Sequence, residues 1–346
     1  MRQLSTAIAM SAAALILGAT ISGQSGPVPI PKPPVAPKPG WAPPKTAWGD
    51  PDISGTFTNK TEQGTPMERP AGFEGRSVDD VRGAELKTLL EDRQRQSDAR
   101  QQFLAGDPTG KIAVLPEFGD RGGIVNGHRA WMIIDPADGK MPAMTEEGQR
   151  RIPWRESGRT GQAASSFSNV GFDSHLDFSL TDRCITRGYP GSMLPGIYGD
   201  SYQIVQGPGF VAIRYEMIHE TRIIPLDSRP HVSRRMHLDM GDARGHWEGA
   251  SLVVETTNFR DRSIYRNASP NALKITERFT RTAPDTVEWT VTVDDPKTWV
   301  RAWTFSLPLT FDNREPVLEY ACHEGNYALR NMLSGERATE REAREK

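Results

Sequence analysis

The sequence predicts a mainly β protein, built as an antiparallel β-barrel or sandwich with a helical N-terminal region. From about residue 200 onward, short segments rich in β-branched and aromatic residues recur at near-regular spacing, and Asp, Pro, Gly and Asn clusters separate them. Helices do not alternate with these segments, so a doubly wound α/β fold is not expected. With 36% hydrophobic and 25% charged residues, the 346-residue chain has the composition of a globular protein.

The N-terminus has the pattern of a bacterial secretory signal peptide. Arg2 is the only charge before an apolar stretch from Ala7 to Ile21, and small residues follow it. This stretch is shorter than the roughly 20 residues that span a bilayer, which makes a membrane anchor the weaker alternative. We therefore expect a signal peptide over 1–23, a periplasmic or secreted protein, and no transmembrane segment.

A proline-rich tether is expected over 24–48, because nine of the 27 prolines fall between residues 27 and 44. A proline-rich recognition ligand is the alternative. A single β-rich domain should then occupy 49–340, followed by a charged tail over 341–346. Within the domain we expect a surface helical insert at about 77–105, which Ser77 and Asp80 would begin as a capping box.

The remaining elements follow from alternation and turn signals. We expect a short helix over 145–154 and a solvated helix from 334. The predicted strands cover 54–57, 128–135, 202–206, 210–219, 221–226, 251–257, 273–281, 286–294, 299–307 and 317–322.

Charge and cysteine content narrow the function classes. The chain has 42 Lys and Arg against 44 Asp and Glu, so its net charge of −2 disfavours a nucleic-acid binder. Cys184 and Cys322 are the two cysteines. In an exported protein they are expected to form a disulfide across a loop of more than a hundred residues, and two buried thiols are the alternative.

Strand phase places several charged side chains beside apolar neighbours. Ile275, Glu277 and Phe279 share one face of their strand, which puts a carboxylate among core residues. If 210–222 and 317–324 are continuous strands, they place His, Arg and Glu side chains in the same way. A barrel with a lined cavity has this pattern, because buried polar groups must be paired or bind a ligand.

These residues suggest acid–base chemistry on a small molecule. A histidine beside a carboxylate can move protons near neutral pH, and an arginine can bind an anionic group. The candidate acid and base are His219 and His323, with Arg222 as the anion-binding residue. The carboxylates expected to orient the histidines are Glu216, Asp227 and Glu324. The candidate substrate-binding residues are Tyr215, Arg229, His231, Trp247 and Tyr327.

Two alternatives remain for these groups. Neighbours such as Glu216 with Arg222, or Glu277 with Arg278, could form structural ion pairs. A zinc or iron site is the other alternative, because seven potential ligands lie within thirty residues: His219, His231, His237, Asp239, Asp242, His246 and Glu248. Their spacing matches no compact motif. The glycine-rich stretch 106–111 is an incomplete phosphate loop, so no cofactor is predicted.

Five segments resemble a large, mostly uncharacterised family of exported bacterial β-rich proteins. They are Arg222–His231 (RIIPLDSRPH), Gly241–Gly249 (GDARGHWEG), Leu252–Phe259 (LVVETTNF), Glu277–Thr280 (ERFT) and Tyr320–Tyr327 (YACHEGNY). The resemblance covers roughly 49–340 and implies export and a β-rich domain, but no substrate. Ser228 stands where the family usually has Gly, and Asp239 where it has an aromatic residue.

Three functions fit these observations. The first is a periplasmic enzyme with a calycin-like barrel, a lyase, isomerase or hydrolase that acts by proton transfer. The second is a non-catalytic barrel that carries a ligand in the cell envelope, and the third is a structural envelope protein.

Overall fold

The computed structural model describes residues 40–105, 127–156, 173–196, 199–261, 265–313 and 316–345. The predicted signal peptide and most of the predicted tether lie outside these ranges. The described helices are α1 (Gly83–Ala105), α2 (Glu146–Glu156) and α3 (Ala328–Arg344). The described strands are β1 (Gly55–Thr58), β2 (Ile133–Asp135), β3 (Ser201–Gly207), β4 (Phe210–Tyr215), β5 (Thr221–Pro225), β6 (Asp242–Glu248), β7 (Ser251–Thr257), β8 (Lys274–Ala283), β9 (Thr286–Asp294) and β10 (Trp303–Phe311).

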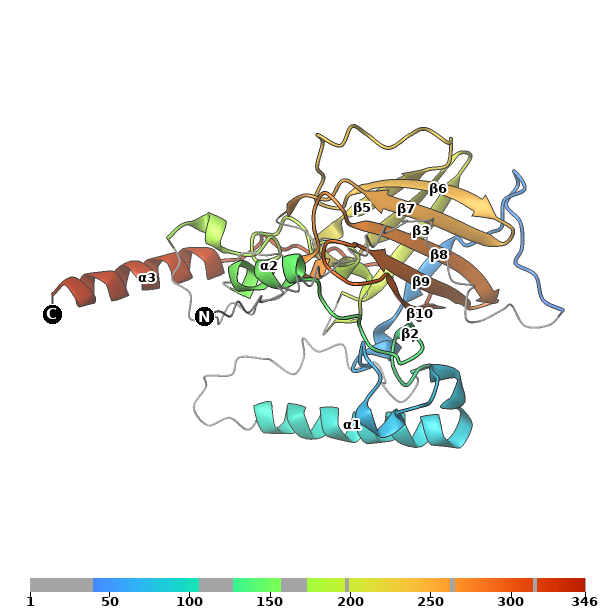
Figure 1. Ribbon diagram of the computed structural model, residues 1–346, viewed down its shortest axis with the longest axis horizontal. Coiled ribbons are helices and arrows are strands. Elements are labelled where there is room, and N and C mark those ends of the chain that lie inside the picture. Colours follow the sequence, from blue (N-terminus) through green and yellow to red (C-terminus); the bar gives the residue numbers. More distant parts are fainter. Residues whose placement is uncertain are drawn as a thin grey trace, which may run out of the picture.

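The strands form one antiparallel sheet that curls into a nearly closed barrel (Figure 1). Their order is β5-β4-β3-β1-β10-β9-β8-β7-β6, and β2 adds to β10 beside this path. The two end strands meet through side chains: a Cβ at Gly245 of β6 would lie 2.8 Å from Ile224 of β5 and 2.7 Å from Leu226. The prediction of a mainly β, antiparallel barrel is confirmed.

Large apolar side chains fill the barrel interior. The inward faces of β8, β9 and β10 alternate as the sequence predicts, and Phe279, Trp289 and Phe305 are fully buried. Trp289 stacks on Phe279 and meets Phe305 edge-on, with ring centroids 6.4 and 5.6 Å apart. Burying each of these side chains stabilises the fold by roughly 1.5–3 kcal/mol. The interior is therefore a packed core.

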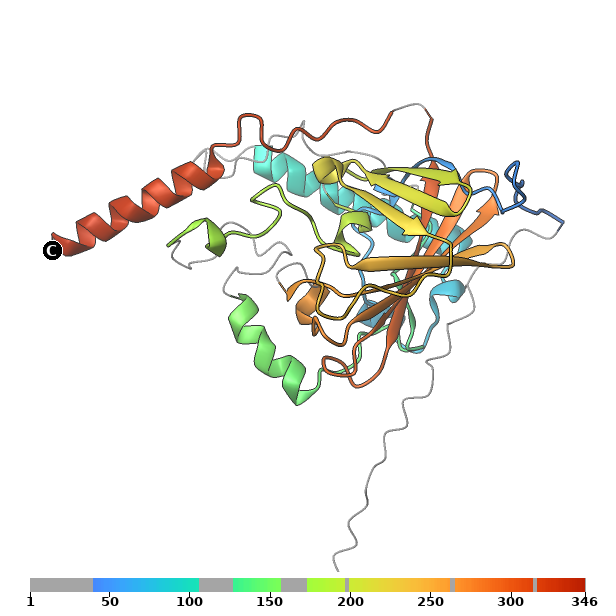
Figure 2. The same cartoon turned by 90° about the horizontal axis from the view of Figure 1, so that it is seen from above.

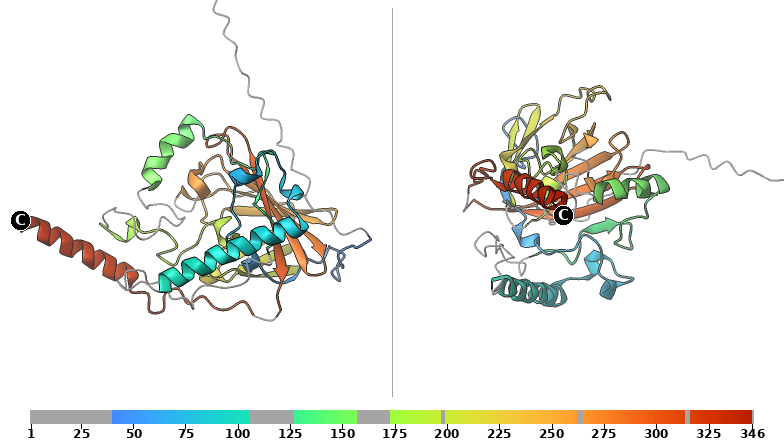
Figure 3. Two further views of the ribbon diagram at one scale, coloured as in Figure 1. Left: turned by 90° about the horizontal axis from the view of Figure 1, so that it is seen from below. Right: turned by 90° about the vertical axis from the view of Figure 1, so that its left-hand side faces the viewer.

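A second layer covers the outer face of β9 and β10. The backbone of 66–67 bonds to that of 132–133, and the Ser306 N–H of β10 bonds to the Met132 carbonyl at 3.0 Å. This layer buries outward-facing polar residues of the sheet, among them Glu288 and Thr304. Helix α1 lies on the far side of the layer, whereas α3 projects away from the barrel (Figures 2 and 3).

The strand predicted over 221–226 is confirmed, but the strand predicted over 210–219 is too long, and the two are not continuous. Strand β4 ends at Tyr215, a short 3₁₀ turn follows, and β5 begins at Thr221. Ile218 and His219 have φ values of 59° and 44° in this turn, and the Tyr215 N–H bonds to the Glu220 carbonyl at 2.8 Å to close the hairpin. The segment contains no Gly, Pro or Asn, so its sequence gives no turn signal.

Two other predicted elements need correction, and one strand was not predicted. Residues 317–322 form no strand. The predicted disulfide between Cys184 and Cys322 is present and ties this segment to the rest of the protein. Strand β6 was not predicted, because charged residues and Gly245 interrupt its alternation. The Ser77 capping box exists, but it caps a 3₁₀ turn over Val78–Asp80, and α1 begins only at Gly83.

Candidate functional site

Arg222 and Glu277 form an ion pair inside the barrel. Arg222 Nη2 lies 2.8 Å from Glu277 Oε2, and the two side chains are 3% and 0% exposed. The Tyr189 hydroxyl and the Trp289 indole N–H both donate to Glu277 Oε1, the latter at 2.9 Å. The Arg222 guanidinium also stacks 4.1 Å above the Tyr189 ring. Strand phase correctly predicted the burial of Glu277, but its partner is Arg222 and not Arg278.

Arg222 and Tyr215 lie in other surroundings than their predicted roles require. Arg222 was predicted to bind an anionic group of the substrate, but its guanidinium faces Glu277 in the packed core. Tyr215, a predicted substrate-binding residue, is also fully buried, and this burial raises the pKa of its hydroxyl.

The predicted acid and base lie outside the barrel. His219 is exposed in the turn after β4, where its Nδ1 lies 3.1 Å from the Tyr320 carbonyl oxygen. His323 and Glu324 are exposed in the turn that follows Cys322. Glu216 accepts a hydrogen bond from the Ser201 N–H at 3.2 Å. The prediction that these residues line a cavity inside the barrel is therefore wrong.

The other predicted residues are scattered. Asp227 and Arg229 pair with each other on the surface, and the Arg229 hydrogen bond lowers the pKa of the Asp227 carboxyl. Trp247 is half-buried and packs against the core. Tyr327 is 64% exposed. Of the predicted set, only His231 lines the cleft that Glu255, Lys274 and Asp294 also line.

This cleft, the His231 cleft, has a volume of about 800 Å³. It lies between the loop over 230–237 and outward-facing residues near the ends of β7, β8 and β9, including Glu255, Lys274 and Asp294. The cleft is thus outside the barrel, and the packed interior holds its walls in place.

Carboxylates flank both ring nitrogens of His231. Its Nδ1 lies 2.9 Å from Asp242 Oδ2, and its Nε2 lies 3.3 Å from Glu255 Oε1. Asp242 is buried, accepts a second hydrogen bond from the Val232 N–H and pairs with Arg244 at 2.7 Å. Asp242 therefore remains an acceptor and fixes Nδ1 as the protonated nitrogen, so that Nε2 faces Glu255 at the cleft wall.

Asn258 anchors the loop that carries His231. Its side-chain amide donates to the backbone carbonyls of Ser233 and Met236 at 2.9 and 3.0 Å. Asn258 has a φ of 58°, a conformation that Asn adopts more readily than most residues. The loop is therefore held against β7 at one end by Asn258 and at the other by His231.

The wall of the cleft near β7, β8 and β9 carries charges of both signs. Lys274 Nζ lies 3.5 Å from Glu255 Oε2. Burial raises the pKa of the Asp294 carboxyl, and the nearby Lys274 partly offsets this effect. On the loop, His237 is held through Nδ1, 2.9 Å from the Phe259 carbonyl. The cleft thus offers both hydrogen-bond donors and acceptors.

Within the part of the chain that the structure describes, no three His, Cys, Asp or Glu residues are grouped so that they could hold a metal ion. His231 and Asp242 were two of the metal-ligand candidates, and they contact each other. His246 pairs instead with Glu248 at 3.1 Å.

Glu255, Lys274 and Asn258 were not predicted as site residues, and Asp242 was predicted only as a possible metal ligand. Asp242, Glu255 and Asn258 do belong to the motifs Gly241–Gly249 and Leu252–Phe259, as His231 belongs to Arg222–His231. Sequence position in these motifs is therefore the signal that could have found them.

Comparison with known proteins adds little. No model of a known protein family matches the chain, and no curated protein matches it. Among solved structures, the chain is similar to a "secretary abundant heat soluble (SAHS) protein from Ramazzottius varieornatus". The two are 14% identical, with 41% of this chain and 90% of that chain covered and a TM-score of 0.24. At this TM-score the similarity supports no conclusion about the site. Among the described residues, no helix is long and apolar enough to cross a membrane.

Proposed function

We propose that this protein is a ligand-binding β-barrel whose His231 cleft binds a small polar molecule. The observation that carries this proposal is the meeting of three sequence motifs at one cleft. They supply His231, Asp242, Glu255 and Asn258, which contact one another or hold the cleft loop. A purely structural barrel gives no reason for a half-exposed histidine between two carboxylates at a cleft of this size.

The lining defines the class of ligand. Glu255 and Asp294 accept hydrogen bonds or face a cationic group, whereas Lys274 donates. Side chains of both signs lie within one cleft, so the favoured ligand donates and accepts hydrogen bonds and has a low net charge. An apolar ligand would desolvate these charges without replacing their contacts with water.

Acid–base catalysis at His231 is the second candidate function. Asp242 holds the Nδ1 proton, so Nε2 is the nitrogen that can accept a proton from a bound molecule. Glu255, on the other side of Nε2, would stabilise the imidazolium that forms. In this candidate function, His231 takes the acid–base role that the sequence predicted for His219 and His323.

We also propose that the chain is exported through its predicted signal peptide and belongs to the family that its motifs resemble. The Cys184–Cys322 disulfide supports export, because such bonds persist in oxidising compartments.

The cleft can be tested with a library of small polar fragments and ligand-observed NMR. We expect some fragments to bind the wild type and to bind His231→Ala about tenfold more weakly or not at all, the loss expected for one or two hydrogen bonds to charged groups. His246→Ala is the matched control, since His246 also pairs with a glutamate but lies outside the cleft. Equal binding to all three proteins would place the ligand elsewhere.

A further inference from the structure

A second pocket lies between the barrel and the helical layer around it. Its volume is about 260 Å³, and we call it the His128 pocket. One wall is apolar and is formed by Val78, Val81 and Leu86. The opposite wall is polar and contains His128, Arg129, Thr282, Thr286 and Glu288. None of these residues contributes to the His231 cleft.

A buried glutamate orients His128. Glu62 is fully buried, and its Oε1 lies 2.8 Å from His128 Nδ1 and accepts the His128 backbone N–H at 2.8 Å. Thr65 donates to the other carboxylate oxygen at 3.3 Å. The imidazole therefore presents its Nε2 edge away from Glu62, and its side chain is 46% exposed at the pocket.

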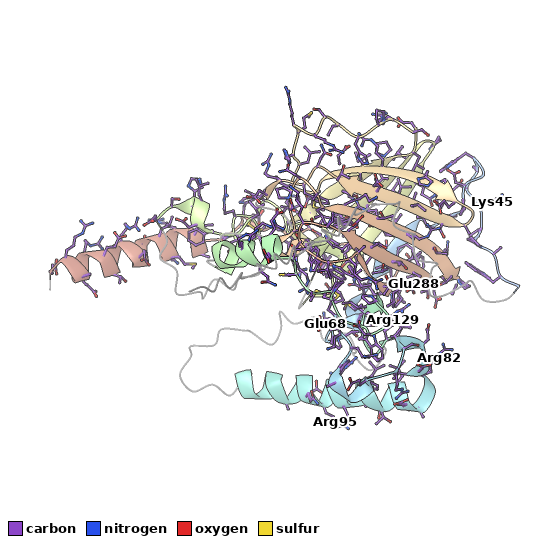
Figure 4. The ribbon with its side chains drawn as sticks, in the orientation of Figure 1. Lys45, Glu68, Arg82, Arg95, Arg129 and Glu288 are labelled. Carbon is purple, nitrogen blue, oxygen red and sulfur yellow. A yellow bond between two sulfur atoms is a disulfide. The ribbon has the colours of Figure 1, made fainter. Side chains whose placement is uncertain are left out.

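Arg129 and Glu288 form an ion pair in the polar wall. Arg129 Nη2 pairs with Glu288 Oε1, both side chains are almost fully buried, and Ser306 also donates to that oxygen. Figure 4 shows this pair at the edge of the barrel that faces α1, with Arg82 on the helical layer. Because Glu288 already neutralises Arg129, the pair fixes the polar wall without adding net charge.

The charge on His128 decides what the pocket attracts. The hydrogen bond that His128 donates to Glu62 raises the pKa of the imidazole, and burial lowers it. The negative charge of Glu288 raises this pKa further, whereas the positive charge of Arg129 lowers it. The charged groups at the rim, Asp79 and Arg82, pair with each other at 3.5 Å. His128 also has a carboxylate partner in Glu62, but the Nε2–H of the protonated ring points away from Glu62 and can donate to a bound anion.

We propose that the His128 pocket binds a small monocarboxylate with an apolar body. The carboxylate would accept a hydrogen bond from His128 Nε2, and the threonine hydroxyls of the polar wall would solvate it. The apolar body would pack on the Val78, Val81 and Leu86 wall. Two observations favour a monoanion: the single imidazole N–H that Glu62 leaves unused, and an apolar wall that would desolvate a second charge.

The test uses benzoate as probe and benzamide as its neutral isostere, titrated calorimetrically into the whole protein at pH 6. We expect benzoate to bind at least about tenfold more tightly than benzamide, the effect of one charge-assisted hydrogen bond. His128→Gln should abolish this preference, whereas the control His246→Gln should keep it. Benzoate binding to the wild type should also weaken as the pH rises from about 6 to 9, because His128 loses its charge.

A purely structural role of His128 would lower the melting temperature of His128→Gln but leave the ratio of benzoate to benzamide affinity unchanged. Should the variant fail to fold, the imidazole ¹H–¹³C signals of the wild type give an independent measurement. Benzoate should shift the signals of His128 and leave those of the His231 cleft in place. Equal affinities for benzoate and benzamide, no benzoate binding at about 20 mM, or shifts at His231 alone would overturn the proposal.

Discussion

Replacing Arg222 with methionine is expected to lower the free energy of unfolding by about 3–5 kcal/mol, because Glu277 would then be a buried carboxylate without its cation. Glu277→Gln should be similarly costly, since it leaves the Arg222 guanidinium unpaired in the core. Urea unfolding followed by tryptophan fluorescence measures both changes, and Trp289 lies against the pair.

The double variant R222M/E277Q separates loss of the pair from loss of packing. A glutamine oxygen can still accept hydrogen bonds from Tyr189 and Trp289, and the methionine fills part of the arginine volume. We therefore expect the double variant to be much more stable than the sum of the two single changes predicts, with a coupling energy of about 2 kcal/mol or more. Arg229→Met, which breaks the exposed pair with Asp227, is the matched control and should change stability little. Additive single effects, or an Arg222→Met variant as stable as this control, would show that the pair is not the main interaction there.

Removing the disulfide is expected to have the other large effect on stability. Cys184 and Cys322 are 138 residues apart in sequence, and the loop-entropy relation gives up to about 4–5 kcal/mol for a loop of this length. The double variant C184S/C322S should lose most of this free energy of unfolding. The same measurement on the wild type with a thiol reductant should reach the level of the variant, and the reductant should leave the variant unchanged.

The bond should also protect the segment around it. Residues 316–327 form no strand, and Leu318 is 58% exposed. We therefore expect proteolysis of the reduced protein to begin in this segment, before the barrel is cut. A free energy of unfolding that does not change on reduction would mean that the disulfide does not restrain the unfolded chain as the loop relation assumes.

Alternation in the sequence was enough to predict several strands of the sheet. Strands β7 and β9 begin and end where the pattern places them, and the apolar neighbours of Glu277 on β8 correctly predicted that this carboxylate is buried. Its partner could not be predicted, because Arg222 comes from β5, on the opposite edge of the sheet order, and meets Glu277 only when the barrel curls.

The candidate site was harder to predict because it depends on loops. Residues 210–222 were assumed to form one strand, so the alternation of side chains between the two faces was continued across what is a turn. This error assigned His219 to the barrel interior. His231 was named as a substrate-binding residue, but its neighbours Asp242 and Glu255 belong to β6 and β7, and only the folded-back loop brings them together. Because the sequence of β6 is rich in charged residues, this strand was not predicted, and neither was the position of Asp242 on it.

The most direct test of the His231 cleft is untargeted mass spectrometry on small molecules that the protein retains or transforms. The chain from residue 24 onward, its His231→Ala variant and the control His246→Ala would each be incubated with a metabolite extract and recovered by ultrafiltration. We expect the wild type and the control to retain at least one small polar compound that His231→Ala does not retain. Consumption of a compound with formation of a product, again only when His231 is present, would show that the cleft is catalytic. If all three proteins retain the same compounds, or none retains any, the proposal that this cleft is the functional site is contradicted.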